Sequence, residues 1–111
     1  MRVNDMATVL KIPVDAGIAD QQMNITLDTI PLTLRVTWNE LAQYWTLSLA
    51  KRDGEAILSN IKMVKNTPLI RRYQLSTPPG EFIFMDNYSG KERPDFYSLG
   101  NDHQLLYRTK Y

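Results

Sequence analysis

A strict alternation of apolar and polar residues at positions 32–38 is the feature that most limits how this chain can fold. The apolar positions are Leu32, Leu34, Val36 and Trp38, and the positions between them are Thr33, Arg35 and Thr37. Because successive side chains of a strand point to opposite faces of a sheet, this pattern predicts a strand with one buried face. The alternation resumes at Trp45, Leu47 and Leu49. We therefore expect a hairpin with both tryptophans on the same sheet face near the loop.

The dipeptide Asp53-Gly54 predicts a second tight turn, because such a pair accepts the two positive φ angles of a type I′ hairpin. A two-residue loop pairs Arg52 with Glu55, Lys51 with Ala56, Ala50 with Ile57, and Leu49 with Leu58. Further along, the apolar positions 57, 58, 61 and 63 cannot all face a core at period two. This irregularity predicts a β-bulge at Asn60, a residue that tolerates a left-handed backbone.

The remaining apolar stretches also favour strands, at 7–12, 23–27, 81–86 and 105–108. No segment of ten or more residues has a period of 3.6, although Phe96 to Leu99 is compatible with one helical turn. The pattern predicts an all-β fold, a small antiparallel β-barrel or sandwich of about six to eight strands. A length of 111 residues with 43% apolar residues suits a single β domain over residues 1–111.

Several kinds of chemistry lack their residues in this sequence. The chain has no cysteine, which excludes disulfides, thiolate zinc sites and thiol catalysis. His103 is the only histidine, and its turn-rich surroundings predict an exposed loop residue. Neither a nucleophile motif nor a glycine-rich phosphate loop is present, so a cryptic hydrolase is the weakest hypothesis. We therefore expect no enzyme activity and no catalytic, cofactor or metal site.

The chain also lacks the apolar segments used for export or membrane insertion. Its first apolar stretch is interrupted by Lys11 and Pro13, and no uninterrupted apolar run approaches the roughly 20 residues that span a bilayer. We expect an intracellular, soluble protein without a membrane partner.

Charge is distributed unevenly along the chain. Residues 51–72 hold six basic and two acidic residues, whereas residues 1–50 hold three basic and five acidic ones. One hypothesis is a small barrel that binds single-stranded nucleic acid through 51–72, with tyrosines as stacking platforms. The other is that these charges protect a sheet edge or contact a protein partner. Because the aromatic residues are dispersed, we favour a protein interface at Lys62, Lys65, Arg71, Arg72 and Tyr73.

The order of these elements resembles the baseplate plug proteins of contractile-tailed bacteriophages, of the type found in a cyanophage baseplate. The similarity runs from about Ile30 to Tyr107. It is carried by Trp38-Asn39, Trp45-Thr46-Leu47-Ser48-Leu49, Asp53-Gly54, Ile57, Phe82-Ile83-Phe84-Met85-Asp86, Gly90, Pro94, Leu99-Gly100, Leu105 and Tyr107. Asn60 stands where a glycine is usual in that family, and asparagine can adopt the same backbone conformation.

The resemblance implies a non-enzymatic part of a phage tail that closes the channel of the central hub and tail tube before contraction. It implies hub and spike proteins as partners, with the tape measure protein as a further one, and several copies around the tail axis. It also implies assembly in the bacterial cytoplasm and a final location in the virion baseplate.

Overall fold

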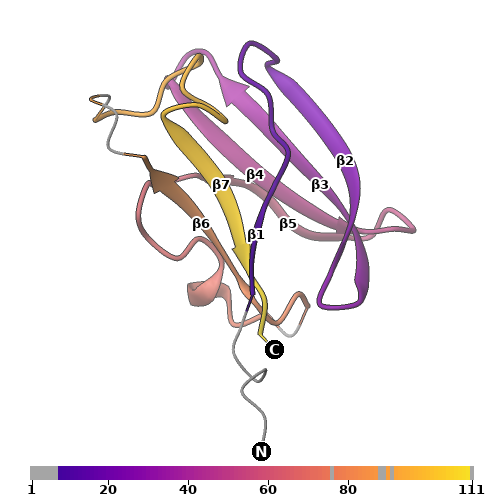
Figure 1. The fold of residues 1–111 in the computed structure, drawn as a ribbon. Helices are drawn as coiled ribbons and strands as arrows, with labels where there is room; N and C mark the ends of the chain where they lie inside the picture. Colours follow the sequence, from indigo (N-terminus) through magenta and orange to yellow (C-terminus); the bar gives the residue numbers. More distant parts are fainter. Residues whose placement is uncertain (1–7, 76, 88–89, 91, 111) are drawn as a thin grey trace, which may run out of the picture.

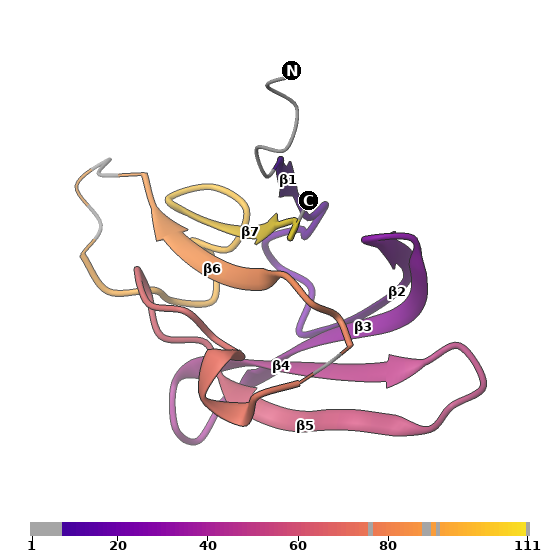
Figure 2. The same ribbon diagram turned by 90° about the horizontal axis from the view of Figure 1, so that it is seen from below.

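The computed structural model consists of two antiparallel sheets that pack against each other (Figure 1). It describes residues 8–75, 77–87, 90 and 92–110. One sheet has the strand order β2-β3-β4-β5 and the other β1-β7-β6. The strands are β1 (Val9–Lys11), β2 (Asp20–Leu27), β3 (Ile30–Asn39), β4 (Tyr44–Lys51), β5 (Ala56–Lys62), β6 (Glu81–Asp86) and β7 (His103–Arg108). Figure 2 shows the two sheets as separate layers.

The all-β prediction is confirmed, and seven strands in the described residues fall within the predicted range. The sheets do not close into a barrel, so the sandwich is the correct one of the two architectures. Closure would require an edge strand of one sheet to pair along its length with an edge strand of the other, and no two strands of different sheets pair in this way among the described residues.

The predicted tryptophan hairpin is confirmed by β3 and β4. Trp38 lies opposite Trp45 in the ladder, and their ring centroids are 5.2 Å apart. Both side chains are buried. Phe96 completes this aromatic cluster, since its ring stacks on Trp45 at a centroid distance of 5.8 Å. The tryptophans are therefore core residues that join the hairpin to the loop before β7.

The predicted type I′ turn at Asp53-Gly54 is wrong. Gly54 has φ +100°, but Asp53 is absent from the residues with positive φ. The backbone carbonyl of Lys51 accepts a hydrogen bond from the Gly54 N–H, and the backbone N–H of Lys51 donates one to the Glu55 carbonyl. This is the pattern of a three-residue loop with a G1 bulge. The Asp53 carboxylate causes the difference, because it accepts a hydrogen bond from the Glu55 N–H at 2.9 Å and fixes the local backbone.

The longer loop also changes the predicted register. Lys51 rather than Arg52 forms the ion pair with Glu55, at 3.5 Å, and Ala50 pairs with Ala56 instead of Ile57. The pairing of Leu49 with Leu58 is confirmed. Farther along β5 the predicted bulge at Asn60 is also confirmed, by a φ of +54° and a register shift between Leu47 and Leu49.

A type I′ turn occurs instead between β2 and β3. Asp28 and Thr29 both have positive φ, and they connect the pair formed by Leu27 and Ile30. The Asp28 carboxylate accepts a hydrogen bond from the Tyr107 hydroxyl at 2.6 Å, and this hydroxyl in turn accepts one from the Gly80 N–H at 2.8 Å. Burial and the bond to Asp28 raise the pKa of Tyr107. This chain of bonds fastens the turn of one sheet to the other sheet.

The hydrophobic core fills the space between the two sheets. The largest fully buried side chains come from both layers: Trp45, Tyr107, Phe82, Phe84, Ile12, Leu27, Leu32, Leu34, Leu47, Leu49, Leu99 and Leu105. Strand β6 matches the predicted range, whereas β1 is shorter and β2 longer than predicted. A short 3-10 helix, η1 (Arg71–Tyr73), interrupts the connection from β5 to β6.

Candidate interaction surface

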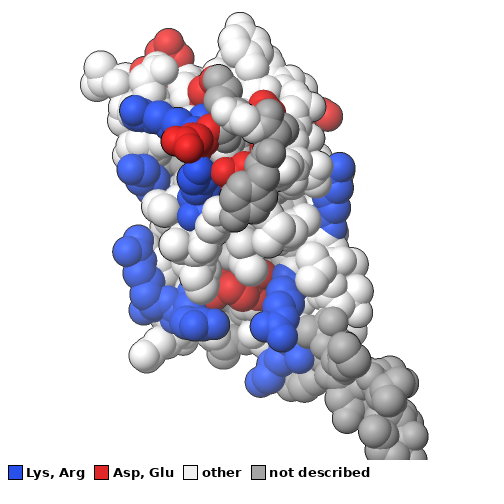
Figure 3. Space-filling model, turned by 60° about the vertical axis from the view of Figure 1, so that its left-hand side comes forward, with Lys and Arg blue, Asp and Glu red and all other residues white. Residues whose placement is uncertain are grey.

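The residues predicted to form an interface lie on the connection from β5 to β6. Lys62 ends β5, Lys65 follows it, and Arg71, Arg72 and Tyr73 form η1. Figure 3 brings forward the side of the molecule that lies to the left in Figure 1, where β6 and η1 are found. Several groups of Lys and Arg side chains lie on this face, with acidic side chains among them (Figure 3).

Lys62 lies at the rim of a pocket at the β3–β4 hairpin end of the sandwich. Its Nζ atom is 5.0 Å from the centroid of the Tyr44 ring, a distance at which a cation and an aromatic face attract each other. The pocket has a volume of about 300 Å³. Its lining consists of Ala42, Gln43, Tyr44, Trp45, Lys62, Met63, Val64, Lys65, Arg93 and Pro94. Its lining thus combines apolar side chains with three cationic ones.

Lys65 differs from Lys62, because it is part of the folded structure rather than of a free surface. Its Nζ atom is 3.0 Å from Oδ2 of Asp86, whose side chain is only 5% exposed, and it also donates a hydrogen bond to the Glu92 carbonyl. The backbone N–H of Asp86 donates to Oδ1 of Asn66. Lys65, one of the residues predicted to form the interface, therefore also neutralises a buried carboxylate within the fold.

The expected exposed position of His103 is wrong. His103 begins β7 opposite Asp86 and is fully buried, with Nε2 at 4.0 Å from Oδ1 of Asp86. Both ring nitrogens lack a hydrogen-bond partner among the described residues. Burial lowers the pKa of His103, although the charge of Asp86 acts in the opposite direction. The alternation of His103, Leu105 and Tyr107, all buried, is the sequence signal that identifies this strand position.

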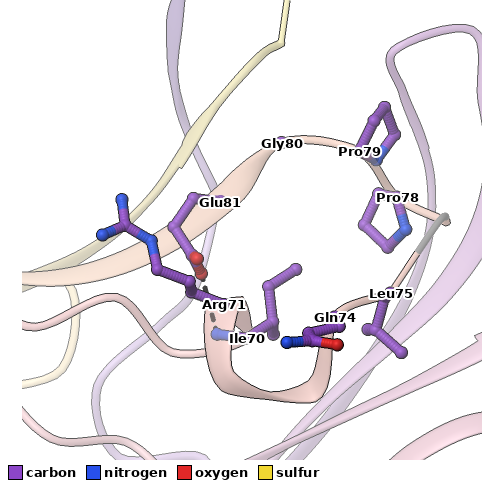
Figure 4. Close-up of a pocket in the computed structure, with 8 residues that line it drawn as sticks. All are labelled: Ile70, Arg71, Gln74, Leu75, Pro78, Pro79, Gly80 and Glu81. Atoms are coloured by element: carbon purple, nitrogen blue, oxygen red, sulfur yellow. Dashed lines mark hydrogen bonds between the residues drawn. The ribbon is translucent and has the colours of Figure 1, made fainter.

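Of the predicted interface residues on η1, Arg71 lines a pocket beside this helix (Figure 4). This pocket has a volume of about 270 Å³, and its lining residues are Ile70, Arg71, Gln74, Leu75, Pro78, Pro79, Gly80 and Glu81. Oε2 of Glu81 accepts hydrogen bonds from the backbone N–H groups of Ile70 at 2.7 Å and Phe82 at 3.0 Å. Glu81 thus fastens η1 to β6, and Arg71 lies beside Glu81 (Figure 4).

The outer side of η1 carries Arg72 and Tyr73. The guanidinium of Arg72 lies 5.1 Å from the centroid of the Tyr73 ring, and its Nη2 atom donates to the Tyr73 hydroxyl at 3.1 Å. Both side chains are exposed. Because Arg72 already stacks on this ring, Tyr73 offers a poorer platform for a nucleic-acid base than the sequence hypothesis requires.

Two further observations limit what the described residues can do. They contain no group of three or more histidine, cysteine, aspartate or glutamate side chains placed to hold a metal ion. No helix among them has the length and apolar character that crossing a membrane requires.

Comparison with known proteins identifies a family for this chain. No curated protein matches the sequence. A family model described as cyanophage baseplate Pam3 plug gp18 matches residues 9–110, a range that begins with β1 and extends past the end of β7. The chain therefore belongs to the family of the cyanophage baseplate plug gp18.

Proposed function

We propose that this protein is a structural component of a contractile phage tail baseplate and plugs the central hub and tail-tube channel before contraction. The observation that carries the proposal is the family match, because it spans both sheets and every described strand. We further propose that residues 1–111 act as one β domain without enzyme activity, assembled in the host cytoplasm and located in the virion baseplate.

The fold suits a part that must hold its shape inside a larger assembly. Aromatic and aliphatic side chains of both sheets form its core, and the fastening of β7 to the β2–β3 turn through Tyr107 ties the layers together. Such a body blocks a channel by volume alone. Its stability does not depend on a disulfide, because the chain has no cysteine.

The partners we propose are hub and spike proteins, with the tape measure protein as a further one. On the connection from β5 to β6, we assign contacts with these partners to the exposed residues Lys62, Arg71, Arg72 and Tyr73. Lys65 contributes to the same face by holding the connection from β5 to β6 in place through Asp86. Several copies around the tail axis would together bind more tightly than one copy alone. Contacts between exposed charges are weak enough to break when the tail contracts.

The test is the composition of purified phage particles before and after contraction. Mass spectrometry should detect the protein in particles with extended tails and show its loss after contraction is triggered. A phage without the gene should lose tail contents early or fail to assemble an infectious tail. Absence of the protein from purified virions would overturn the proposal. If the protein is retained after contraction, it is still a baseplate protein, but the plug role is contradicted.

A further inference from the structure

The four edges of the two sheets are protected to different degrees. Strand β5 is distorted by two register shifts, and β6 is covered by residues 65–68, which form bridges to Phe84 and Ile83. Strand β1 has only three residues. Strand β2, in contrast, pairs with β3 over eight residues without a register shift and has no described strand on its other side. Natural sheets usually blunt such an edge, because it is a template for another chain.

The register shows which peptide groups β2 presents at this edge. The turn at Asp28-Thr29 makes Leu27 and Ile30 the closing hydrogen-bonded pair, and Ala19 accepts a hydrogen bond from the Trp38 N–H at 2.7 Å. In an antiparallel ladder, bonded positions alternate along each strand. Odd-numbered residues of β2 therefore bond to β3, and the residues whose peptide groups point away from β3 are Asp20, Gln22, Asn24 and Thr26.

The core-facing side chains beside this edge are incompletely covered. Met23 and Ile25 lie opposite the buried Leu34 and Leu32, yet they are only half-buried. On the other sheet, Leu10 lies opposite the buried Tyr107 and remains 38% exposed. Figures 1 and 2 both place β1 and β2 on the same flank of the sandwich. Apolar side chains that point inward thus stay accessible where the two sheets end.

We infer that the edge of β2 accepts an extended segment of a neighbouring baseplate protein as a fifth strand, and that this segment carries apolar residues at alternate positions. The outward peptide groups of β2 can form hydrogen bonds with an added strand. The accessible core-facing side chains would then contact the side chains on the inner face of that strand, which should be apolar. The identity of the neighbour as a baseplate protein rests on the proposed function.

A second copy of this chain fits the edge less well. In the antiparallel registers that pair most of β2 with itself, Gln21 of each copy lies opposite Ile25 or Leu27 of the other. The Gln21 amide is held on its own chain, since its Nε2 atom donates to the Asp15 carbonyl at 2.6 Å and its Oε1 atom accepts from the Asp15 N–H at 2.9 Å. Self-pairing would therefore bury two fixed polar groups against apolar ones.

Hydrogen exchange at single-residue resolution tests the inference. In the isolated protein the amides of Gln22, Asn24 and Thr26 should exchange quickly, whereas those of Met23 and Ile25 are protected by β3. In purified baseplates the even-numbered amides should slow by about tenfold or more, the factor that corresponds to 1.4 kcal/mol of added protection. Fast exchange of these amides in baseplates that contain the protein would overturn the inference while leaving the proposed function intact.

Two variants at one position provide a matched test. Gln22→Pro removes an outward N–H without removing a bond to β3, so the isolated variant should keep the fold and its melting temperature within a few degrees. We expect it to be lost from baseplates, while the control Gln22→Thr, which keeps the N–H, is incorporated normally. Equal incorporation of the two folded variants would contradict strand addition. If the proline variant unfolds, the exchange experiment on the wild-type protein decides.

The exchange experiment also separates other occupants of the edge. Protected even-numbered amides in an isolated dimer would assign the edge to a second copy. The same protection in an isolated monomer would mean that the chain closes its own edge. Either result overturns the inference of a neighbouring protein.

Discussion

The two flanks of the sandwich are built differently. At the β5–β6 flank, residues 63–70 run along β6, with hydrogen bonds from the N–H groups of Asn66 and Leu69 to the carbonyls of Phe84 and Phe82. The ion pair between Lys65 and Asp86 lies on this flank. At the β1–β2 flank a short strand and a regular strand end the sheets, and none of the described residues covers them in a comparable way. One edge is thus covered by hydrogen-bonded residues of the same chain, and the other presents the peptide groups that the inferred partner strand would use.

The largest expected effect comes from the aromatic cluster at the hairpin end. Trp45→Ala should lower the free energy of unfolding by about 3–5 kcal/mol, because the side chain is fully buried and stacks on Phe96. On the open flank, Met23→Ala should cost clearly less, because Met23 is only half-buried. Chemical denaturation of both variants measures the difference. Equal losses would contradict the contrast between a closed core and an open flank.

The next largest effect is a difference in stability between variants of Lys65 and Lys62, two lysines that were predicted to lie in one interface. Lys65→Met should destabilise the fold by about 2 kcal/mol, because it removes the ion pair between Lys65 and the buried carboxylate of Asp86. We take a value below that of a fully buried pair, since the Lys65 side chain is 31% exposed. The control Lys62→Met, at an exposed position, should change stability by less than about 0.5 kcal/mol.

A double variant shows whether the buried charge is the cause. Adding Asp86→Asn to Lys65→Met removes the carboxylate that has lost its ion pair with Lys65 and should restore part of the lost stability. If Lys65→Met were as harmless as Lys62→Met, the closed flank would not depend on this ion pair.

The same flank should make stability depend on pH. Because burial lowers the pKa of His103 below its ordinary value of 6.5, the folded protein favours the neutral ring. As the pH falls through about 6.5, the unfolded chain binds a proton that the folded chain does not, so stability decreases. Denaturation between pH 8 and pH 5.5 should show this decrease, and His103→Leu should remove it. A wild-type profile as flat as that of the variant would mean that His103 can be protonated in place.

The predictions from sequence succeeded where local pattern and tertiary structure agree. The alternation along β3 and β4 located the hairpin, and the apolar positions along β5 located the bulge at Asn60. The turn at Asp53-Gly54 failed because a single side-chain bond to the Glu55 N–H changed the loop length. The type I′ turn at Asp28-Thr29 was missed because the bond that fastens it comes from Tyr107, far along the chain.

The candidate surface was harder to predict because charge pattern does not show which cations already have partners. Lys65 meets Asp86 only through the fold, 21 positions along the chain. His103 was assigned to a loop because the preceding Gly100-Asn101-Asp102 sequence is typical of a turn, while the strand begins at the very next residue. Arg93 joins the pocket of Lys62 from a distant loop that no periodicity marks.

The smallest expected effect concerns the alternative hypothesis of nucleic-acid binding through residues 51–72. In this segment Lys65 is paired with Asp86 and Arg72 stacks on Tyr73, so fewer cations and rings are available than the sequence suggests. Fluorescence anisotropy with a single-stranded oligonucleotide should therefore detect no more than weak binding at physiological salt. Binding through this segment would instead fall with salt by a log–log slope of about −0.7 for each neutralised phosphate.

A double variant, Arg71→Gln with Arg72→Gln, completes that test and compares the two flanks directly. It leaves the Lys65–Asp86 pair intact, so the fold should keep its stability to within about 1 kcal/mol. Incorporation into baseplates should weaken, because these exposed cations are assigned to partner contacts. Tight oligonucleotide binding by the wild-type protein that is lost in this variant would favour the nucleic-acid hypothesis. If the double variant is incorporated into baseplates as well as the wild-type protein, assembly depends on the edge of β2 and not on Arg71 and Arg72.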